Sequence, residues 1–278
     1  MIPILGGLGA ALCWGCSTVV ASRSTRLIGS QQALAYVMLL GFVALAVIAA
    51  LTGVPAHAGT HPWAWAVLAG AGSAAGLSLM YRALRGGKVG VVAPIASTEG
   101  AIAAVISIGL GEQLTLGVAA CLIVVAGGVV LVTLRGRASD VHLRPSLFAL
   151  GAACLFGVNL VASAHAGDAL GAVWTIFVAR IVGMILIVLP LLLRGSLRLP
   201  GAAWWMVLFS ATAEVVGFTC YVVGSHHGVA IPAVLGSQFA AVATIGSFIV
   251  FGERIGPRQI AGATVIVVGV SALAALRA

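Results

Sequence analysis

Three ionisable residues lie deep inside long apolar stretches of the sequence, where charge is costly. Glu99 occurs in the run Ser-Thr-Glu-Gly, while Arg180 and Glu214 lie in two later stretches that follow one another. An isolated charge in an apolar environment must be paired, neutralised or placed beside a water-filled cavity. Glu99 could therefore bind an ammonium group or a proton. The alternative is a structural carboxyl group, held by hydrogen bonds to Ser97, Thr98 or a backbone carbonyl.

Arg180 and Glu214 are predicted to form an ion pair. Arg180 lies ten residues into the apolar stretch 170–193, and Glu214 lies ten residues before the end of the stretch 201–224. If these stretches are antiparallel helices, a rise of about 1.5 Å per residue puts both side chains roughly 15 Å from the same face of the membrane. This matched depth favours a structural pair. In the alternative, Glu214 lines a binding cavity.

The composition indicates which elements must hold these residues. Hydrophobic residues make up 62% of the 278 residues, and charged residues only 7%. A soluble protein of this size needs far more charge on its surface, whereas a transmembrane helix needs about 20 mainly apolar residues. The sequence therefore predicts an all-α integral membrane protein that crosses the lipid bilayer ten times. The predicted spans are 3–22, 32–52, 64–84, 89–111, 115–134, 146–166, 170–193, 201–224, 229–251 and 256–276.

The two halves of the chain resemble each other. The run GAALCWG at 9–15 matches GAACLFG at 151–157, and Ser97 matches Ser237 at a separation of 140 residues. Each half contains five predicted spans. Because five is an odd number, the second half must enter the membrane from the opposite side, which makes an inverted repeat. The predicted divisions are a first repeat at 1–134, a linker at 135–145 and a second repeat at 146–278.

The basic residues predict the orientation of these repeats. Twelve of the 14 Lys and Arg residues lie in alternate predicted loops, and the linker is one of those loops. Short loops rich in Lys and Arg face the cytoplasm, so we expect a cytoplasmic linker and both termini outside. The net charge of +8 comes from these scattered residues. Since they form no cluster, no nucleic-acid partner is expected.

Several segments resemble a known family. The segment A-P-I-A-S-T-E-G followed by L-G-E, and its second copy V-L-G-S-Q-F followed by F-G-E-R-I, are similar to the EamA type of the drug/metabolite transporter superfamily. The resemblance covers essentially the whole chain. It implies a bacterial-type inner-membrane exporter of amino acids, other metabolites or drugs, with alternating access to a central cavity between the repeats. The short chain is most similar to YddG-like exporters of aromatic and neutral amino acids.

The chain departs from one branch of that superfamily. The four-helix multidrug transporters use a glutamate in their first helix for proton coupling, whereas this chain has Trp14 near that position. The matching residue of the second repeat, Phe156, carries no charge either. Proton coupling by that particular device is therefore not expected.

The cavity implied by the resemblance would be apolar with a few polar points. Such a site suits zwitterions with hydrophobic side chains better than phosphates or sugars, so we expect broad specificity for neutral amino acids and exclusion of acidic ones. Arg180 is assigned to the structural ion pair. The residues expected to line the cavity are Trp14, Met80, Tyr81, Ser97, Glu99, Asn159, Glu214, Ser237 and Gln238.

Other functions fit the sequence less well. Cys13 and Cys16 form a C-x-x-C pair inside the first span, where they are interpreted as packing residues. His226 and His227 are adjacent and have no further ligand beside them, so no metal or cofactor is expected. The chain has no Walker A motif and no Ser-His-Asp set, which disfavours an enzyme. We expect a monomer that exports amino acids. A multidrug or cationic-compound exporter is the first alternative, ahead of a membrane enzyme or a receptor.

Overall fold

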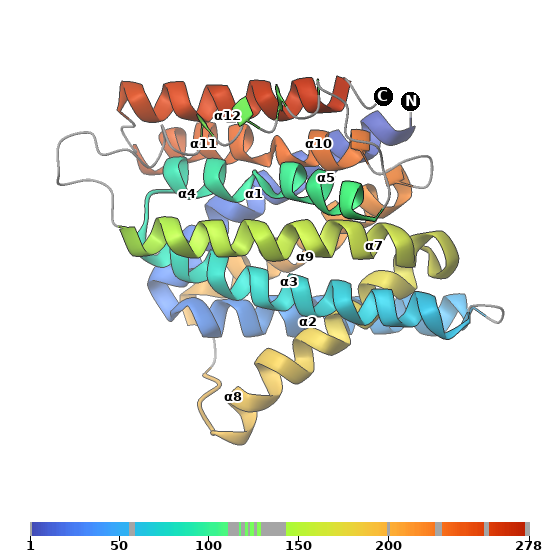
Figure 1. Ribbon diagram of the computed structural model, residues 1–278. Coiled ribbons are helices and arrows are strands. Elements are labelled where there is room, and N and C mark those ends of the chain that lie inside the picture. Colours follow the sequence, from blue (N-terminus) through green and yellow to red (C-terminus); the bar gives the residue numbers. More distant parts are fainter. Residues whose placement is uncertain are drawn as a thin grey trace.

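The computed structural model describes residues 2–55, 59–110, 143–198, 201–225, 230–252 and 256–275, together with isolated positions between 117 and 128. Every regular element within these residues is helical (Figure 1), as predicted. In chain order the elements are α1 (Ile2–Ile28), α2 (Ser30–Thr52), α3 (Thr60–Gly86), α4 (Val89–Ala96), α5 (Glu99–Gly109), α7 (Leu143–Gly183), the π-helix η1 (Met184–Val188), α8 (Leu189–Leu193), the 3₁₀-helix η2 (Gly201–Ala203), α9 (Trp204–Ser225), α10 (Ala230–Ser237), α11 (Phe239–Phe251) and α12 (Pro257–Ala275).

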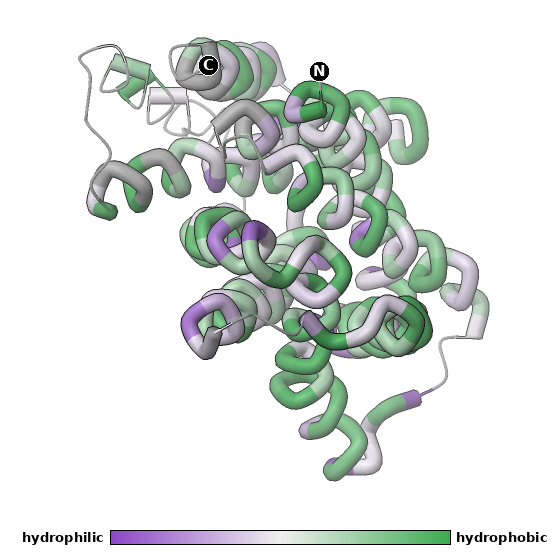
Figure 2. The backbone as a smooth tube through the Cα atoms, turned by 90° about the vertical axis from the view of Figure 1, so that its right-hand side faces the viewer, coloured by the Kyte–Doolittle hydropathy of each residue, from purple (hydrophilic) through white to green (hydrophobic). Residues whose placement is uncertain are grey.

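Length and composition make these helices suitable for a membrane. Among the described residues, five stretches are long and apolar enough to span a bilayer, namely Ile2–Ile28, Ser30–Thr52, Thr60–Gly86, Leu143–Leu193 and Gly201–Ser225. Shorter apolar helices cover Val89–Ala103, Leu235–Phe251 and Ile260–Gly269. Apolar residues occur along most of the helices (Figure 2), and large ones such as Leu51 and Ile249 lie exposed on the outside. These features confirm the predicted all-α membrane fold.

The bundle is held together by close contacts between helices from the two halves of the chain. Helix α3 packs along α7, α1 along α9, and α4 beside α11. Small residues allow this approach, because a Cβ atom on Gly70 would lie only 2.8 Å from the Cα atom of Ala179. Membrane helices commonly use glycine and alanine in this way, since packing rather than exclusion from water drives their association.

Two predicted spans are broken in the middle. The span 89–111 consists of α4 and α5, separated at Ser97 and Thr98, and the span 229–251 consists of α10 and α11, separated at Gln238. The backbone tightens at both breaks: Thr98 N–H donates to Ile95 O at 3.2 Å, and Gln238 N–H donates to Leu235 O at 3.1 Å, in each case three residues back. Such tight turns interrupt an α-helix. Both breaks fall inside the predicted spans, and the sequence analysis did not predict them.

The boundary between the predicted spans 146–166 and 170–193 also differs from expectation. Helix α7 continues through the predicted loop and turns at Gly171, whose φ of 69° and ψ of 171° are not helical. A residue with a Cβ atom is strained at positive φ, which explains the glycine. Helix α7 begins at Leu143, so it includes the end of the predicted linker; residues 135–142 and most of the predicted span 115–134 lie outside the described residues.

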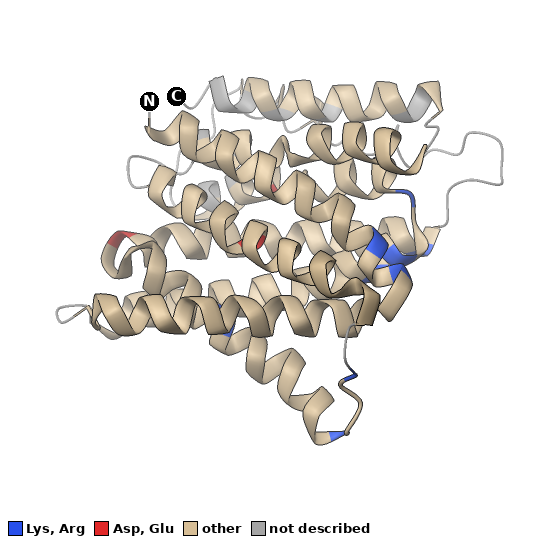
Figure 3. Ribbon diagram, turned by 180° about the vertical axis from the view of Figure 1, so that it is seen from behind, with Lys and Arg blue, Asp and Glu red and all other residues tan. Residues whose placement is uncertain are grey.

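The two ends of the described chain lie at the same end of the bundle. Most of the described Lys and Arg residues gather at the opposite end (Figure 3). Termini at one end agree with a chain that crosses the membrane an even number of times. Basic residues at the other end agree with basic loops on one side of the membrane. Which side faces the cytoplasm stays a prediction.

Candidate functional site

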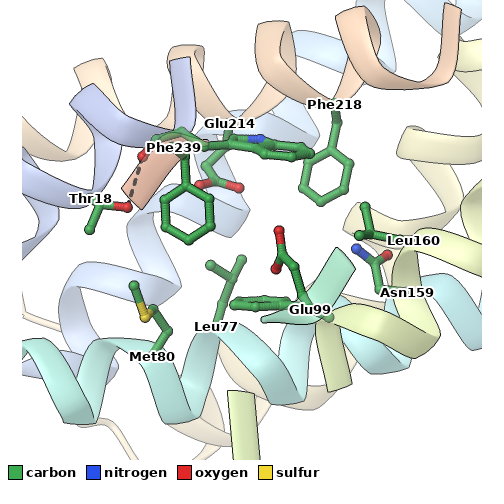
Figure 4. Close-up of a pocket in the computed structure, with 11 residues that line it drawn as sticks. Thr18, Leu77, Met80, Glu99, Asn159, Leu160, Glu214, Phe218 and Phe239 are labelled. Carbon is green, nitrogen blue, oxygen red and sulfur yellow. Dashed lines mark hydrogen bonds between the residues drawn. The ribbon is translucent and has the colours of Figure 1, made fainter. Parts of the chain in front are cut away.

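A cavity of about 440 Å³, including its part open to solvent, lies inside the bundle between the two halves of the chain. Helices α1, α3 and α5 of the first half and α7, α9 and α11 of the second half contribute to it (Figure 4). The lining residues are Trp14, Thr18, Leu77, Met80, Glu99, Phe156, Asn159, Leu160, Glu214, Phe218 and Phe239.

Five of the residues that the sequence suggested for the cavity line it. They are Trp14, Met80, Glu99, Asn159 and Glu214. They come from five different helices, and Figure 4 shows the labelled side chains around one space. The bundle therefore brings together residues that are up to 200 positions apart in the chain, from Trp14 to Glu214. Their roles in binding remain a prediction.

The other four suggested residues are not among those that line the cavity. Tyr81 is buried next to the ion pair, and its hydroxyl has no hydrogen-bond partner among the described residues. Ser97 and Ser237 donate to carbonyl oxygens of their own helices, those of Pro94 and Ala233 respectively. The Gln238 amide donates to the Ser271 hydroxyl on α12 at 3.2 Å. Three of the four, all except Tyr81, thus belong to the helix breaks rather than to the cavity wall.

Glu99 is the first residue of α5, directly after the break. Its side chain is buried, with 4% exposed, and points into the cavity (Figure 4). The hydroxyl groups of Ser97 and Thr98 donate to Pro94 O and Ile95 O, so neither is available to the carboxyl group as a donor. Within the described chain Glu99 forms no ion pair. The glutamate is therefore free to bind a group that enters the cavity.

Arg180 and Glu214 approach each other at the edge of the cavity. Arg180 Nη2 lies 4.0 Å from Glu214 Oε2, and the Ser17 hydroxyl donates to Glu214 Oε1 at 3.4 Å. Arg180 also donates from Nη1 to the sulfur of Met38 at 3.2 Å. Its Nε and Nη2 atoms have no hydrogen-bond partner in the described part of the chain. The contact is thus a long ion pair, in which the guanidinium retains hydrogen-bonding capacity.

Aromatic rings form much of the remaining wall. The ring of Trp14 meets that of Phe218 edge to face, with centroids 5.0 Å apart. Phe156 and Phe239 line the same cavity. The sequence analysis did not name the three phenylalanines as cavity residues. It also missed Thr18, Leu77 and Leu160. Helical spacing could have found Phe218, which lies four residues after Glu214 on the same face of α9.

Among the described residues, no group of three or more His, Cys, Asp or Glu residues could hold a metal ion. The His226–His227 pair lies outside the described residues.

Comparison with known proteins decides the family. The profile of the EamA-like transporter family matches twice, over residues 1–134 and 143–275. This chain belongs to the EamA-like transporter family. A search of curated proteins found no match. A solved crystal structure, described only as that of a protein, has 18% identical residues and a TM-score of 0.71, and the match covers 99% of this chain and 96% of the other. That likeness shows a shared fold.

The EamA-like assignment gives the chain a general function. EamA-like proteins are membrane transporters of the drug/metabolite superfamily, so the chain is a multi-pass membrane protein that moves a small molecule across the bilayer.

Proposed function

We propose that this EamA-like transporter exports small neutral or aromatic amino acids and related metabolites across the inner membrane. The observation that carries the proposal is the pairing of the Glu99 carboxyl group with aromatic and aliphatic walls in one buried cavity. Glu99 binds the ammonium group of the substrate. The aromatic rings, together with Leu77 and Leu160, enclose its side chain, and burial contributes about 25 cal/mol per Å² of apolar area.

The remaining polar residues orient the substrate. Asn159 lies on the cavity wall, where its amide can pair with the substrate carboxylate. Tyr81 and the residues of the two helix breaks change their contacts when the helices move. A buried polar atom without a partner, such as the Tyr81 hydroxyl, is costly, so a second conformation that provides a partner is favoured.

Alternating access is supported by the two broken spans. The breaks at Ser97–Thr98 and at Gln238 occupy matching places in the two halves and lie on the helices beside the cavity. Discontinuous helices at a repeat interface commonly form the binding site of secondary transporters. One break serves each side of the membrane. Such a pair of gates suits transport, whereas an enzyme or a receptor has no need of it.

The cavity walls make specificity broad. One methylene group changes binding in an apolar pocket by only about 1–3 kcal/mol, so threonine, methionine and the aromatic amino acids all bind. Acidic amino acids bind poorly, because the described lining of the main cavity contains no Lys or Arg residue and the charge of Arg180 is opposed by that of Glu214.

Competition in proteoliposomes tests the proposal. Purified protein is reconstituted and uptake of labelled methionine is measured with and without a proton gradient, while unlabelled amino acids compete. Neutral and aromatic amino acids should compete, and glutamate and sugar phosphates should not. If glutamate or a sugar phosphate competes better than methionine, this picture of the cavity is wrong, although membership of the transporter family still stands.

One observation favours a second candidate, the export of organic cations. Two carboxyl groups, Glu99 and Glu214, share a cavity with the Trp14, Phe156, Phe218 and Phe239 rings. Aromatic faces and carboxylates together bind quaternary ammonium groups. Uptake of a methyl-viologen-like dication with no inhibition by methionine would favour this second function over amino-acid export.

A further inference from the structure

A second cavity, of about 790 Å³ including its part open to solvent, lies away from the candidate site, where α2, α3 and the segment of η1 and α8 meet. Ser78 and Arg82 line it from α3, one helical turn apart on one face. Leu77 and Met80 of the same helix line the candidate site instead. The two cavities therefore lie on different faces of α3, and the second has no part in the function proposed above.

One wall of this cavity is suited to an anion. Arg82 and Arg194 line it, both are exposed, and neither forms an ion pair with any residue that the structure describes. Ser30, the first residue of α2, lines the same cavity, and the N-terminus of α2 has no side-chain cap. Ser30 is only 8% exposed. Two arginines, a serine hydroxyl and a helix N-terminus all favour negative charge.

The opposite wall is apolar. Leu186, Pro190 and Arg194 are spaced four residues apart and so lie in one row along the helix. Ile187 and Leu191, also four residues apart, form a second row beside it. Leu186 is 53% exposed, so this wall continues onto the outer surface of the bundle. The segment ending in α8 slopes away from the other helices (Figure 1).

We propose that this cavity binds an anionic phospholipid from the leaflet at the arginine-rich end of the bundle. Arg82 and Arg194 contact the phosphate, Ser30 and Gln31 bond its oxygens, and an acyl chain follows the row of Leu186 and its neighbours. A free phosphate would use only the polar wall, whereas a lipid uses both. Basic pockets between helices near the membrane surface are suited to such headgroups.

The lipid would tie together the two halves of the transporter. Arg82 and the α2 terminus belong to the first half of the chain, and Arg194 belongs to the second. One phosphate that contacts both arginines would hold α8 against α3. We therefore expect an anionic lipid to stabilise the protein against heat more than a zwitterionic lipid does.

Native mass spectrometry of the full chain in detergent tests the site. Phosphatidylglycerol or phosphatidylcholine is titrated into the wild type, into R82Q/R194Q, and into R23Q/R85Q, which loses the same charge at two exposed arginines outside the cavity. R82Q/R194Q should bind phosphatidylglycerol about 25-fold more weakly than the wild type, roughly fivefold for each arginine. R23Q/R85Q should stay within about twofold. Equal weakening in both double variants, or equal binding of the two lipids by the wild type, would refute the site.

Two further measurements complete the experiment. A large excess of inorganic phosphate should leave phosphatidylglycerol binding unchanged; displacement by phosphate would show a free-phosphate site and overturn the lipid assignment. The lipid-free melting temperature of each variant shows whether it folds. If R82Q/R194Q does not fold, each single variant should show a fivefold loss, and a loss below twofold in both would contradict the proposal.

Discussion

The Arg180 guanidinium donates to the sulfur of Met38 at 3.2 Å, and these two residues occupy matching positions in the aligned halves of the chain. A residue can touch its own counterpart only close to the axis that relates two repeats. Trp14 and Phe156, another matched pair, line the same cavity. The cavity and the ion pair beside it therefore lie near the centre of the repeat arrangement. At this matching position the first half has the thioether of Met38 and the second half has the charged Arg180.

Breaking the ion pair should destabilise the protein more than removing it. In Arg180→Ala the buried Glu214 carboxylate loses its partner, which costs about 3–5 kcal/mol for a buried pair. The double variant Arg180→Met with Glu214→Gln keeps the volume and removes both charges, so part of that loss should be recovered. Thermal unfolding in detergent measures both. Strictly additive losses of the single variants in the double variant would show that the two residues do not interact.

Glu99→Gln should lower methionine uptake about tenfold or more while leaving the melting temperature nearly unchanged. The amide keeps the shape of the side chain but removes the charge that is proposed to bind the ammonium group. The matched control is Asp168→Asn, which removes an exposed carboxylate outside the cavity. A Glu99→Gln protein that transports at the wild-type rate would assign Glu99 a structural role.

Gly72→Ala should destabilise the contact between α3 and α7. A Cβ atom at this position would lie 2.9 Å from the Leu155 carbonyl oxygen, and a backbone atom cannot move aside easily. Overpacking of this kind costs about 1–3 kcal/mol. Gly59→Ala is the control, because a Cβ atom there meets nothing within 4 Å. We expect a lower melting temperature for the first variant only; equal melting temperatures would mean that the helices can separate at little cost.

The topology can be tested without any transport assay. A reporter that is active only in the cytoplasm should be inactive when it is fused to the C-terminus and active when it is inserted in the 135–145 linker. The reason is the alternation of basic loops. The opposite pattern would reverse the proposed orientation of the whole bundle.

Sequence reasoning predicted the spans well because apolar length is a strong signal, and it missed the breaks because their signal is local. A proline such as Pro94 is tolerated inside a membrane helix, so its presence did not indicate that the helix ends at Ala96. The turn at Gly171, in contrast, lies within two residues of the predicted loop at 167–169. Backbone hydrogen bonds three residues back decide such breaks, and composition does not reveal them.

The cavity shows a similar limit. Charged and polar residues in apolar spans stand out in a sequence, which is why Glu99, Asn159 and Glu214 could be named in advance. Leucine and phenylalanine are common in every membrane helix, so Leu77 and Phe239 had no distinguishing mark. Most of the missed residues lie one helical turn from a named one, as Thr18 does from Trp14. The spacing rule of a helix would have extended the list.

The turn at Gly171 joins two arms of one helix through a single residue. The first arm carries Asn159 on the cavity wall, and the second carries Arg180 of the ion pair. Because only one residue separates the two arms, a movement of one changes the position of the other. We therefore expect the filling of the cavity and the loosening of the ion pair to be one mechanical event, and a flexible insertion at Gly171 to uncouple loading from movement.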